Sequence, residues 1–449
     1  MLGQMRLMKQ WVNMFKHTIF FMLVIMVFEP YAHAADLVDI YNRSLLHNND
    51  LKVITNNHKI SKEIYNQTSS SIFPEVSITA TTQENYINRY TGSGNVSDYT
   101  SDTATVNIKQ PIIRIYFFDE LNKAESILDK SEISIENYRR DLMIKSTELY
   151  FALVNAQNRL NEAKIKNNIS LLRFNNAKNL FSNGFITDVE FNKYKNEYRI
   201  SNVDYQISDN NLVLAKQDIY LLTGKDILEV NNLNPMIDIP LSFYDKDLLI
   251  NKAMNSFDSI KLAMLDVSIS QDEIKSNKSQ HYPTLDFTAT YDYSDITGGS
   301  RLGQQTRESN TIGLTLNIPI YQGGYQSSKV NEARYKYENS KLALDQLRRN
   351  IKKDIINNVN THNILKNLMI ANKENYLSKN EDYKTIKNGQ YSGIYTDVEL
   401  SEAEYDLNVA RNDLIETTLN YLIVDLKLKN YSSELNIKNI KQLNDMFIW

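Results

Sequence analysis

The heptapeptide Gly184-Phe185-Ile186-Thr187-Asp188-Val189-Glu190 returns, nearly unchanged, as Gly393-Ile394-Tyr395-Thr396-Asp397-Val398-Glu399. The two copies are 209 residues apart, and the same offset relates Phe73-Pro74 to Tyr282-Pro283. A constant offset over most of a chain predicts two copies of one structural unit. With only two copies and so long a period, the sequence indicates a duplication rather than a repeat array.

This duplication divides the chain into parts. We expect a signal peptide at 1–34, a first repeat at 35–232, a linker at 233–242, a second repeat at 243–430 and a C-terminal tail at 431–449. Each repeat should contain a helix, a β-hairpin, a long helix, a tight tip hairpin and a return helix. The β-hairpins are predicted at about 74–111 and 283–319, and the tips near 184 and at 389–393.

The composition excludes several classes of function. The net charge is −4 and the pI is about 6.0, so the chain has no basic field for nucleic acid. No cysteine is present, which excludes disulfides, thiolate metal sites and thiol nucleophiles. The six histidines are scattered without metal-ligand spacing. The sequence therefore predicts no enzyme, no metal and no cofactor.

The N-terminus has the pattern of a secretory signal. Lys9 and Lys16 precede an apolar run at 19–28, and Ala32-His33-Ala34 offers a small-residue cleavage site. Ten apolar residues are too few to span a bilayer, which needs about 20. We expect the mature chain to begin near Ala35, outside the cytoplasm.

Two stretches without glycine or proline predict very long helices. They lie between Pro111 and Gly184 and between Gly324 and Gly389, and each would reach on the order of 100 Å as one helix. Apolar side chains recur in them at helical spacing, which indicates a face buried against other helices. These positions are Leu142, Thr147, Leu149, Leu153, Ala156 and Leu160, and then Leu342, Leu344, Leu347, Ile351, Ile355 and Val359.

Apolar and polar residues alternate in the segments between the helices. Val76, Ile78 and Ala80 should face Ala104, Val106 and Ile108, and a second hairpin has the odd positions of 285–293 against the even positions of 312–318. Such strands suit a soluble sheet with one wet face, and equally a barrel with lipid outside and water inside.

Three features favour the barrel. The strands are roughly 10 to 13 residues long, enough to cross a bilayer when tilted. Polar loops at 89–102 and 295–310 join their tips. Aromatic residues flank the strands, as an interfacial girdle requires; they are Phe73, Tyr116, Phe117, Phe118, Tyr282, Tyr321 and Tyr325.

Four strands per chain leave two open edges, which hydrocarbon does not tolerate. Two copies would give 8 strands with a lumen filled by side chains, and three would give 12 strands around a water-sized lumen. A conduit therefore requires at least three chains.

At this point the motifs resemble those of the TolC-like outer-membrane efflux proteins, over about Ala35 to Asn430. The matching features are the mature start Ala35–Tyr41, the paired (Phe/Tyr)-Pro strand entries, the strand exits Gln110–Ile112 and Ile318–Gly324, and the two Gly-x-x-x-Asp-Val hairpins. The resemblance implies a mainly α fold with a transmembrane β-barrel portion. A homotrimer would form a 12-strand barrel and a long α-helical periplasmic barrel.

The resemblance also implies a function. The chain would be the exit duct of a tripartite efflux or type I secretion system in the outer membrane of a Gram-negative bacterium. It would conduct substrates passively from an inner-membrane transporter of the RND or ABC type, through a periplasmic adaptor (membrane fusion) protein. The alternative is a secreted coiled-coil structural protein or a periplasmic adaptor. Partition into the outer membrane would separate the two.

The family's periplasmic gate maps onto the hairpin tips at Gly184 and Gly393. The resemblance places Glu399 and Glu402 on an acidic ring that narrows the pore, and Glu190 on the corresponding position of the first repeat. The competing interpretation is that these residues are ordinary solvated acids of a helix.

Two partner positions of the gate depart from the family pattern. Gln390 stands where a tyrosine is expected, and Tyr395 stands where an arginine is expected. An ion pair from Glu190 to that arginine is therefore not available, and we expect a hydrogen bond between Glu190 and Tyr395 instead.

Overall fold

The computed structural model describes residues 36–86, 98–227, 229–299 and 304–447. The predicted signal peptide lies outside these residues, as do parts of the two strand-joining loops. Within the described residues, none of the helices combines the length and the hydropathy needed to cross a membrane.

The order of elements is the same in the two halves of the chain. The first half contains α2 (Leu37–His47), α3 (Asn49–Ser70), β1 (Glu75–Asn85), β2 (Tyr99–Ile113), α4 (Ile115–Ser182) and α5 (Asp188–Thr223). The second contains α6 (Lys246–Ser256), α7 (Asp258–Ser279), β3 (Thr284–Gly298), β4 (Gln305–Asn317), α8 (Tyr325–Tyr391) and α9 (Asp397–Tyr431), followed by α10 (Ile437–Asn444). The two long helices have 68 and 67 residues, which confirms the prediction from the absence of glycine and proline.

The segment before each hairpin forms two helices rather than the expected one. The first break is at Asn48, whose backbone is extended and whose side chain accepts a hydrogen bond from the Leu51 N–H at 2.8 Å. An asparagine in this position caps the following helix. The second break is at Phe257, which is also extended but forms no side-chain cap.

All four strands form one antiparallel sheet in the order β1-β2-β3-β4. The expected register is confirmed, since Val76 pairs with Ile108 and Ile78 with Val106. The two hairpins are joined through β2 and β3, where Ile108 pairs with Ala289. Two strands are longer than predicted: β2 and β3 each have 15 residues and extend into segments expected to be loops.

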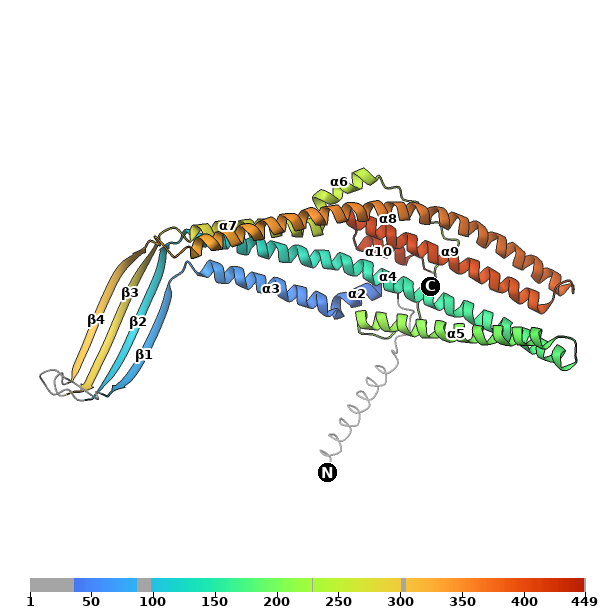
Figure 1. The fold of residues 1–449 in the computed structure, drawn as a ribbon, viewed down its shortest axis with the longest axis horizontal. Coiled ribbons are helices and arrows are strands. Elements are labelled where there is room, and N and C mark those ends of the chain that lie inside the picture. Colours follow the sequence, from blue (N-terminus) through green and yellow to red (C-terminus); the bar gives the residue numbers. More distant parts are fainter. Residues whose placement is uncertain (1–35, 87–97, 228, 300–303, 448–449) are drawn as a thin grey trace, which may run out of the picture.

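The sheet lies at one end of the molecule, beyond the ends of the helices (Figure 1). Its apolar positions share one face across all four strands, because the paired positions fall on the same side of the pleat. Ile78 and Leu314 on this face are 74% and 68% exposed. Of the predicted flanking aromatics, Phe117 is buried rather than exposed.

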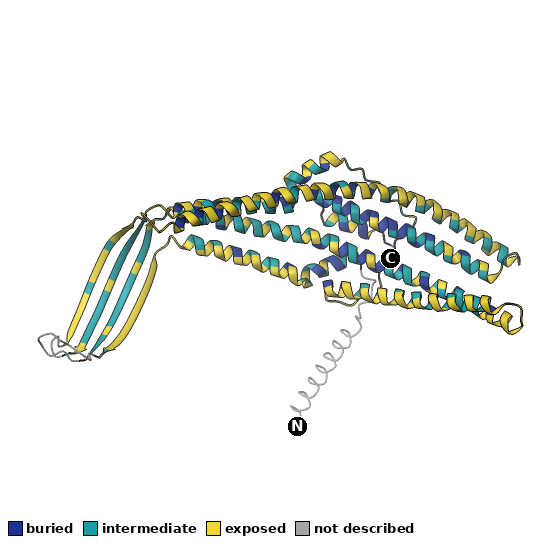
Figure 2. Ribbon diagram, viewed as in Figure 1, coloured by how far each residue is buried: buried dark blue, intermediate teal, exposed yellow. Residues whose placement is uncertain are grey.

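The main core lies in the middle of the helical part, where Figure 2 shows most of the buried residues. Here α4, α5 and α9 pack against α10 and the segment between the repeats. The side chains predicted to form the apolar faces of the two long helices are buried or half-buried, except for Leu342, which is 65% exposed. Leu344 occupies the buried position on that turn of α8.

The segment before α6 is anchored to the second long hairpin by buried polar groups. The Ser242 N–H donates to the Tyr421 hydroxyl at 3.0 Å, and the Tyr244 hydroxyl donates to Asp425 at 2.7 Å. Burial alone would raise the pKa of Asp425, but its polar contacts with His362, Lys429 and Tyr244 hold that pKa well below its ordinary value. Asp425 therefore stays ionised and keeps this anchor in place.

Ile355 tests the packing of α8 against α6 and α7. Its side chain is fully buried in a cluster with Leu249 and Ile260. We expect Ile355→Ala to lower the free energy of unfolding by about 2 to 5 kcal/mol, since it leaves a cavity. The measurement is denaturant unfolding in detergent, followed by circular dichroism. Ile394→Ala, at a position that is 72% exposed, is the control and should change little. Equal effects would contradict this packing.

Candidate functional site

The two repeated heptapeptides form identical turns at the far end of the helical part. Gly184 and Gly393 have φ of +76° and +74°, the left-handed region that glycine adopts without strain. The Phe185 and Ile394 N–H groups each donate 2.9 Å hydrogen bonds back to the end of the preceding helix. This pattern is a Schellman motif, which ends a helix at a glycine.

A capping box begins the return helix on each side. The Thr187 hydroxyl accepts from the Glu190 N–H at 3.2 Å, and Thr396 accepts from Glu399 at the same distance. In return, the Thr396 N–H donates to the Glu399 carboxylate at 2.7 Å. This backbone hydrogen bond, with one from the Thr396 hydroxyl, holds the pKa of Glu399 below its ordinary value. Glu190 and Glu399 are thus fixed by their own helices.

The second tip is also fixed by its two unusual residues. Gln390 donates to the Asp397 carboxylate at 2.9 Å across the turn. The Tyr395 ring lies against Gly389, so closely that a Cβ there would be 2.6 Å from the ring. Within one chain, Tyr395 thus packs on its own hairpin, while Glu190 is on the other one. The hydrogen bond between them stays a prediction about neighbouring hairpins.

Glu402 makes a contact that the sequence did not reveal. It forms an ion pair with Arg173 of α4, which joins the first hairpin to the second. The two residues are 229 positions apart, so no local pattern connects them. Both side chains are more than one third exposed, and the pair is accordingly weak and sensitive to salt.

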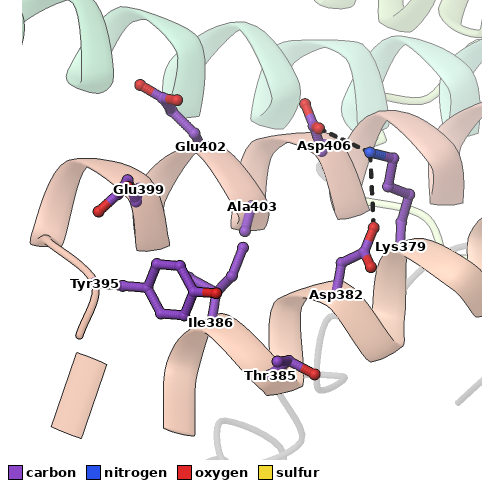
Figure 3. Close-up of a pocket in the computed structure, with 9 residues that line it drawn as sticks. All are labelled: Lys379, Asp382, Thr385, Ile386, Tyr395, Glu399, Glu402, Ala403 and Asp406. Carbon is purple, nitrogen blue, oxygen red and sulfur yellow. Dashed lines mark hydrogen bonds and ion pairs between the residues drawn. The ribbon is translucent and has the colours of Figure 1, made fainter. Parts of the chain in front are cut away.

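Glu399, Glu402 and Tyr395 line one cavity of about 380 Å³ between α8 and α9 (Figure 3). Its remaining lining residues are Lys379, Asp382, Thr385, Ile386, Ala403 and Asp406. Lys379 lies 3.1 Å from Asp406 and 3.9 Å from Asp382. Four carboxylates with one lysine leave the cavity acidic. In the described part of the chain, no group of side chains is arranged to hold a metal ion.

Further from the tips, the junction between α4 and α9 is also polar. Arg159 contacts Asp413 at 3.1 Å and Glu416 at 2.7 Å. Asn412 donates to Glu162 at 3.0 Å. Together with the Arg173–Glu402 pair, these contacts connect the two hairpins from the core towards the tip.

Comparisons with known proteins agree with this architecture. A family model described as "Outer membrane efflux protein" matches residues 249–432. Outer membrane protein TolC of Escherichia coli K12 is 22% identical over 431 residues, covering 93% of this chain and 86% of TolC. The proteases secretion protein PrtF of Dickeya chrysanthemi is 20% identical over 358 residues, covering 78% of this chain and 76% of PrtF.

Among solved structures, the CmeC outer membrane channel of Campylobacter jejuni has a TM-score of 0.73 at 16% identity. The alignment covers 92% of this chain and 90% of CmeC. The outer membrane protein VceC of Vibrio cholerae has a TM-score of 0.67 at 15% identity, covering 88% and 96%. At such identities these structures establish the fold. The match to the outer membrane efflux family model and the similarity to TolC, rather than these structures, indicate a TolC-like protein of the outer membrane of a Gram-negative bacterium.

Proposed function

We propose that this protein is the outer-membrane exit duct of a tripartite efflux or type I secretion system, through which substrates pass without energy input from the duct. The observation that carries this proposal is the apolar face that runs across all four strands at the far end of the molecule. The names of the relatives, which include TolC and a proteases secretion protein, support the same class of function.

The dimensions of this face suit a bilayer. Leu285 to Tyr293 spans about 27 Å along the strand, of the same order as the apolar band of outer-membrane barrels. At the end of that band the same face becomes polar, since Glu308 is paired to Tyr293 and, further along, Asp102 is paired to Asp295. At the other end the aromatic side chains of Phe73, Tyr282 and Tyr321 are exposed. This succession supports a face in contact with lipid between two interfaces.

Closure of the sheet supports a trimer. β1 and β4 are the edges of the four-stranded sheet, and an open edge cannot persist in hydrocarbon. Pairing β1 of one copy with β4 of the next closes a ring, and three copies give 12 strands. The helices would then form a second barrel that extends into the periplasm, with the hairpin tips at its mouth.

Energy must come from partners under this proposal. The chain has no Gly-Lys-Ser/Thr phosphate-binding loop, so we assign energy coupling to an inner-membrane transporter of the RND or ABC type. A periplasmic adaptor protein would connect it to the hairpin tips.

Charge placed on either face of β4 tests the membrane assignment. We expect Leu314→Arg to cost about 2 to 4 kcal/mol at the middle of the bilayer and to reduce outer-membrane assembly. Thr315→Arg should be tolerated, because Thr315 lies on the polar face opposite Asp286. The measurement is native mass spectrometry of trimers extracted from outer membranes. Equal trimer yields from the two variants would refute this membrane orientation.

At the periplasmic end, we assign the gate to the tip residues. Glu399 and Glu402 would line the narrowest part, where a trimer brings six carboxylates around one axis. Glu190 and Tyr395 would hold neighbouring hairpins together by hydrogen bonding, and Gln390 would stabilise its own tip through its hydrogen bond across the turn. The acidic cavity next to Glu399 supports a mouth that attracts cations.

Removing charge without removing shape tests the acidic ring. Glu399→Gln keeps the capping box, because glutamine serves at that position as well as glutamate. We expect Glu399→Gln with Glu402→Gln to abolish block by multivalent cations from the periplasmic side and to reduce cation preference. Single-channel recording in a planar bilayer measures both. Unchanged block in an intact trimer would show that the acids are ordinary solvated residues.

The Arg173–Glu402 pair provides a test of how the mouth is held closed. We expect Arg173→Gln to raise the mean conductance, with a larger effect at low salt, where the intact pair is strongest. Lys166→Gln is the matched control, since Lys166 pairs with Asp204 at 3.1 Å within the first hairpin. If the two variants conduct alike, the junction between hairpins does not control the opening.

A further inference from the structure

In the helical part, α5 and α8 are the two outer helices, which we call the margins. The order of long and return helices makes these two margins fit one another. Moving α4 and α5 forward by 209 residues places them on α8 and α9 to within one residue at every end. α4 and α8 are therefore equivalent helices, and so are α5 and α9. In the tip half the helices lie side by side in the order α5, α4, α9, α8 (Figure 1). One margin is thus a return helix and the other is a long helix.

The junction between the hairpins, α4 against α9, joins a long helix to a return helix. The two margins differ in the same way, since α8 is a long helix and α5 is a return helix. A second copy placed beside the first would bring its α5 against α8 and repeat the α4–α9 junction. This is a head-to-tail contact, which closes into a ring when the rotation between copies allows.

The duplication converts each contact of the internal junction into a predicted contact between copies. Arg159, which meets Asp413 and Glu416, corresponds to Leu368, which would meet Asp204 and Ile207 of the next copy. The charged pair of Arg159 and Glu416 inside the chain would thus be replaced, between copies, by the apolar pair of Leu368 and Ile207. Leu368 and Ile207 are 45% and 54% exposed in the single chain, as an unformed interface requires.

The ion pair nearest the tips is preserved with its charges exchanged. Arg173 corresponds to Asp382, and Glu402 corresponds to Lys193. Both Asp382 and Lys193 are exposed in the single chain. An arginine–glutamate pair inside the chain therefore becomes an aspartate–lysine pair between chains. Two positions that reverse together retain an attraction, which gives the margins charge complementarity.

We infer that α8 of one copy packs against α5 of the next in this register, with Leu368 against Ile207 and Asp382 paired to Lys193. The occupant of each margin is thus a second copy of this chain. The inference rests on the proposed trimer and adds to it the faces that meet and the residues that set their alignment.

Because the chain has no cysteine, introduced cysteines test this register directly. The variant Leu368→Cys with Ile207→Cys should be linked between copies by a short bis-maleimide, giving covalent species of up to three chains. Leu368→Cys with Leu221→Cys is the control, because Leu221 is also exposed on α5 but lies about 21 Å further along the helix. Only the first variant should be linked. Equal linking in both, or none in either, would overturn the register.

Charge exchange tests the pair near the tips. Lys193→Asp and Asp382→Lys should each lower the trimer fraction in dilute detergent several-fold, and their combination should restore it. Failure of the combination to restore the trimer would overturn the pair.

The outcomes for the register and for the conduit are distinguishable. A trimer by native mass without the Leu368–Ile207 link would reject this interface and leave the proposed duct standing. Linked trimers that pass no current in a bilayer would retain the interface and reject the duct.

Discussion

The whole architecture depends on the continuity of two helices of 68 and 67 residues. A helix of about 100 Å cannot be enclosed in a compact core, so its apolar side chains must be covered along its length by other helices. Helices packed side by side cover these apolar side chains, and they form a layer with two broad faces and two outer helices. The central core, the anchored segment before α6 and the tight tips all hold this layer together. In the proposed trimer, the two outer helices are where this layer would continue into other copies.

Much of this fold follows from local features of the sequence. The absence of glycine and proline predicted the long helices, and alternation in the strands predicted their pairing, since a slip by one residue would turn every side chain to the wrong face. The ends of β2 and β3 were missed because both strands continue into polar residues, where apolar side chains no longer mark the alternation. The break at Asn48 was missed because asparagine disrupts a helix less visibly than proline does.

The candidate site was less predictable, for a physical reason. The turns at Gly184 and Gly393 are local motifs, and a close reading of the capping residues finds both. The Arg173–Glu402 pair depends on how two hairpins lie together, and nothing near Arg173 in the sequence distinguishes it from other basic residues of α4. Leu342 shows the same limit for packing: helical spacing placed both Leu342 and Leu344 in the buried stripe, but only Leu344 is covered, in a cluster that includes residues of α6, α7 and α9.

The ion pairs between α4 and α9 bear on how strongly the hairpins must attract one another, within one chain and between copies. The two hairpins are parts of one polypeptide, so each experiences the other at a high effective concentration and needs little attraction of its own. Separate copies have no such tether, and their contact must supply the full free energy of association. The tether thus allows the part of the internal junction nearest the tips to be held by an exposed ion pair that weakens with salt, while the apolar core between α4 and α9 lies further from the tips. Between copies, the proposed apolar contact of Leu368 with Ile207 would make up in part for the missing tether.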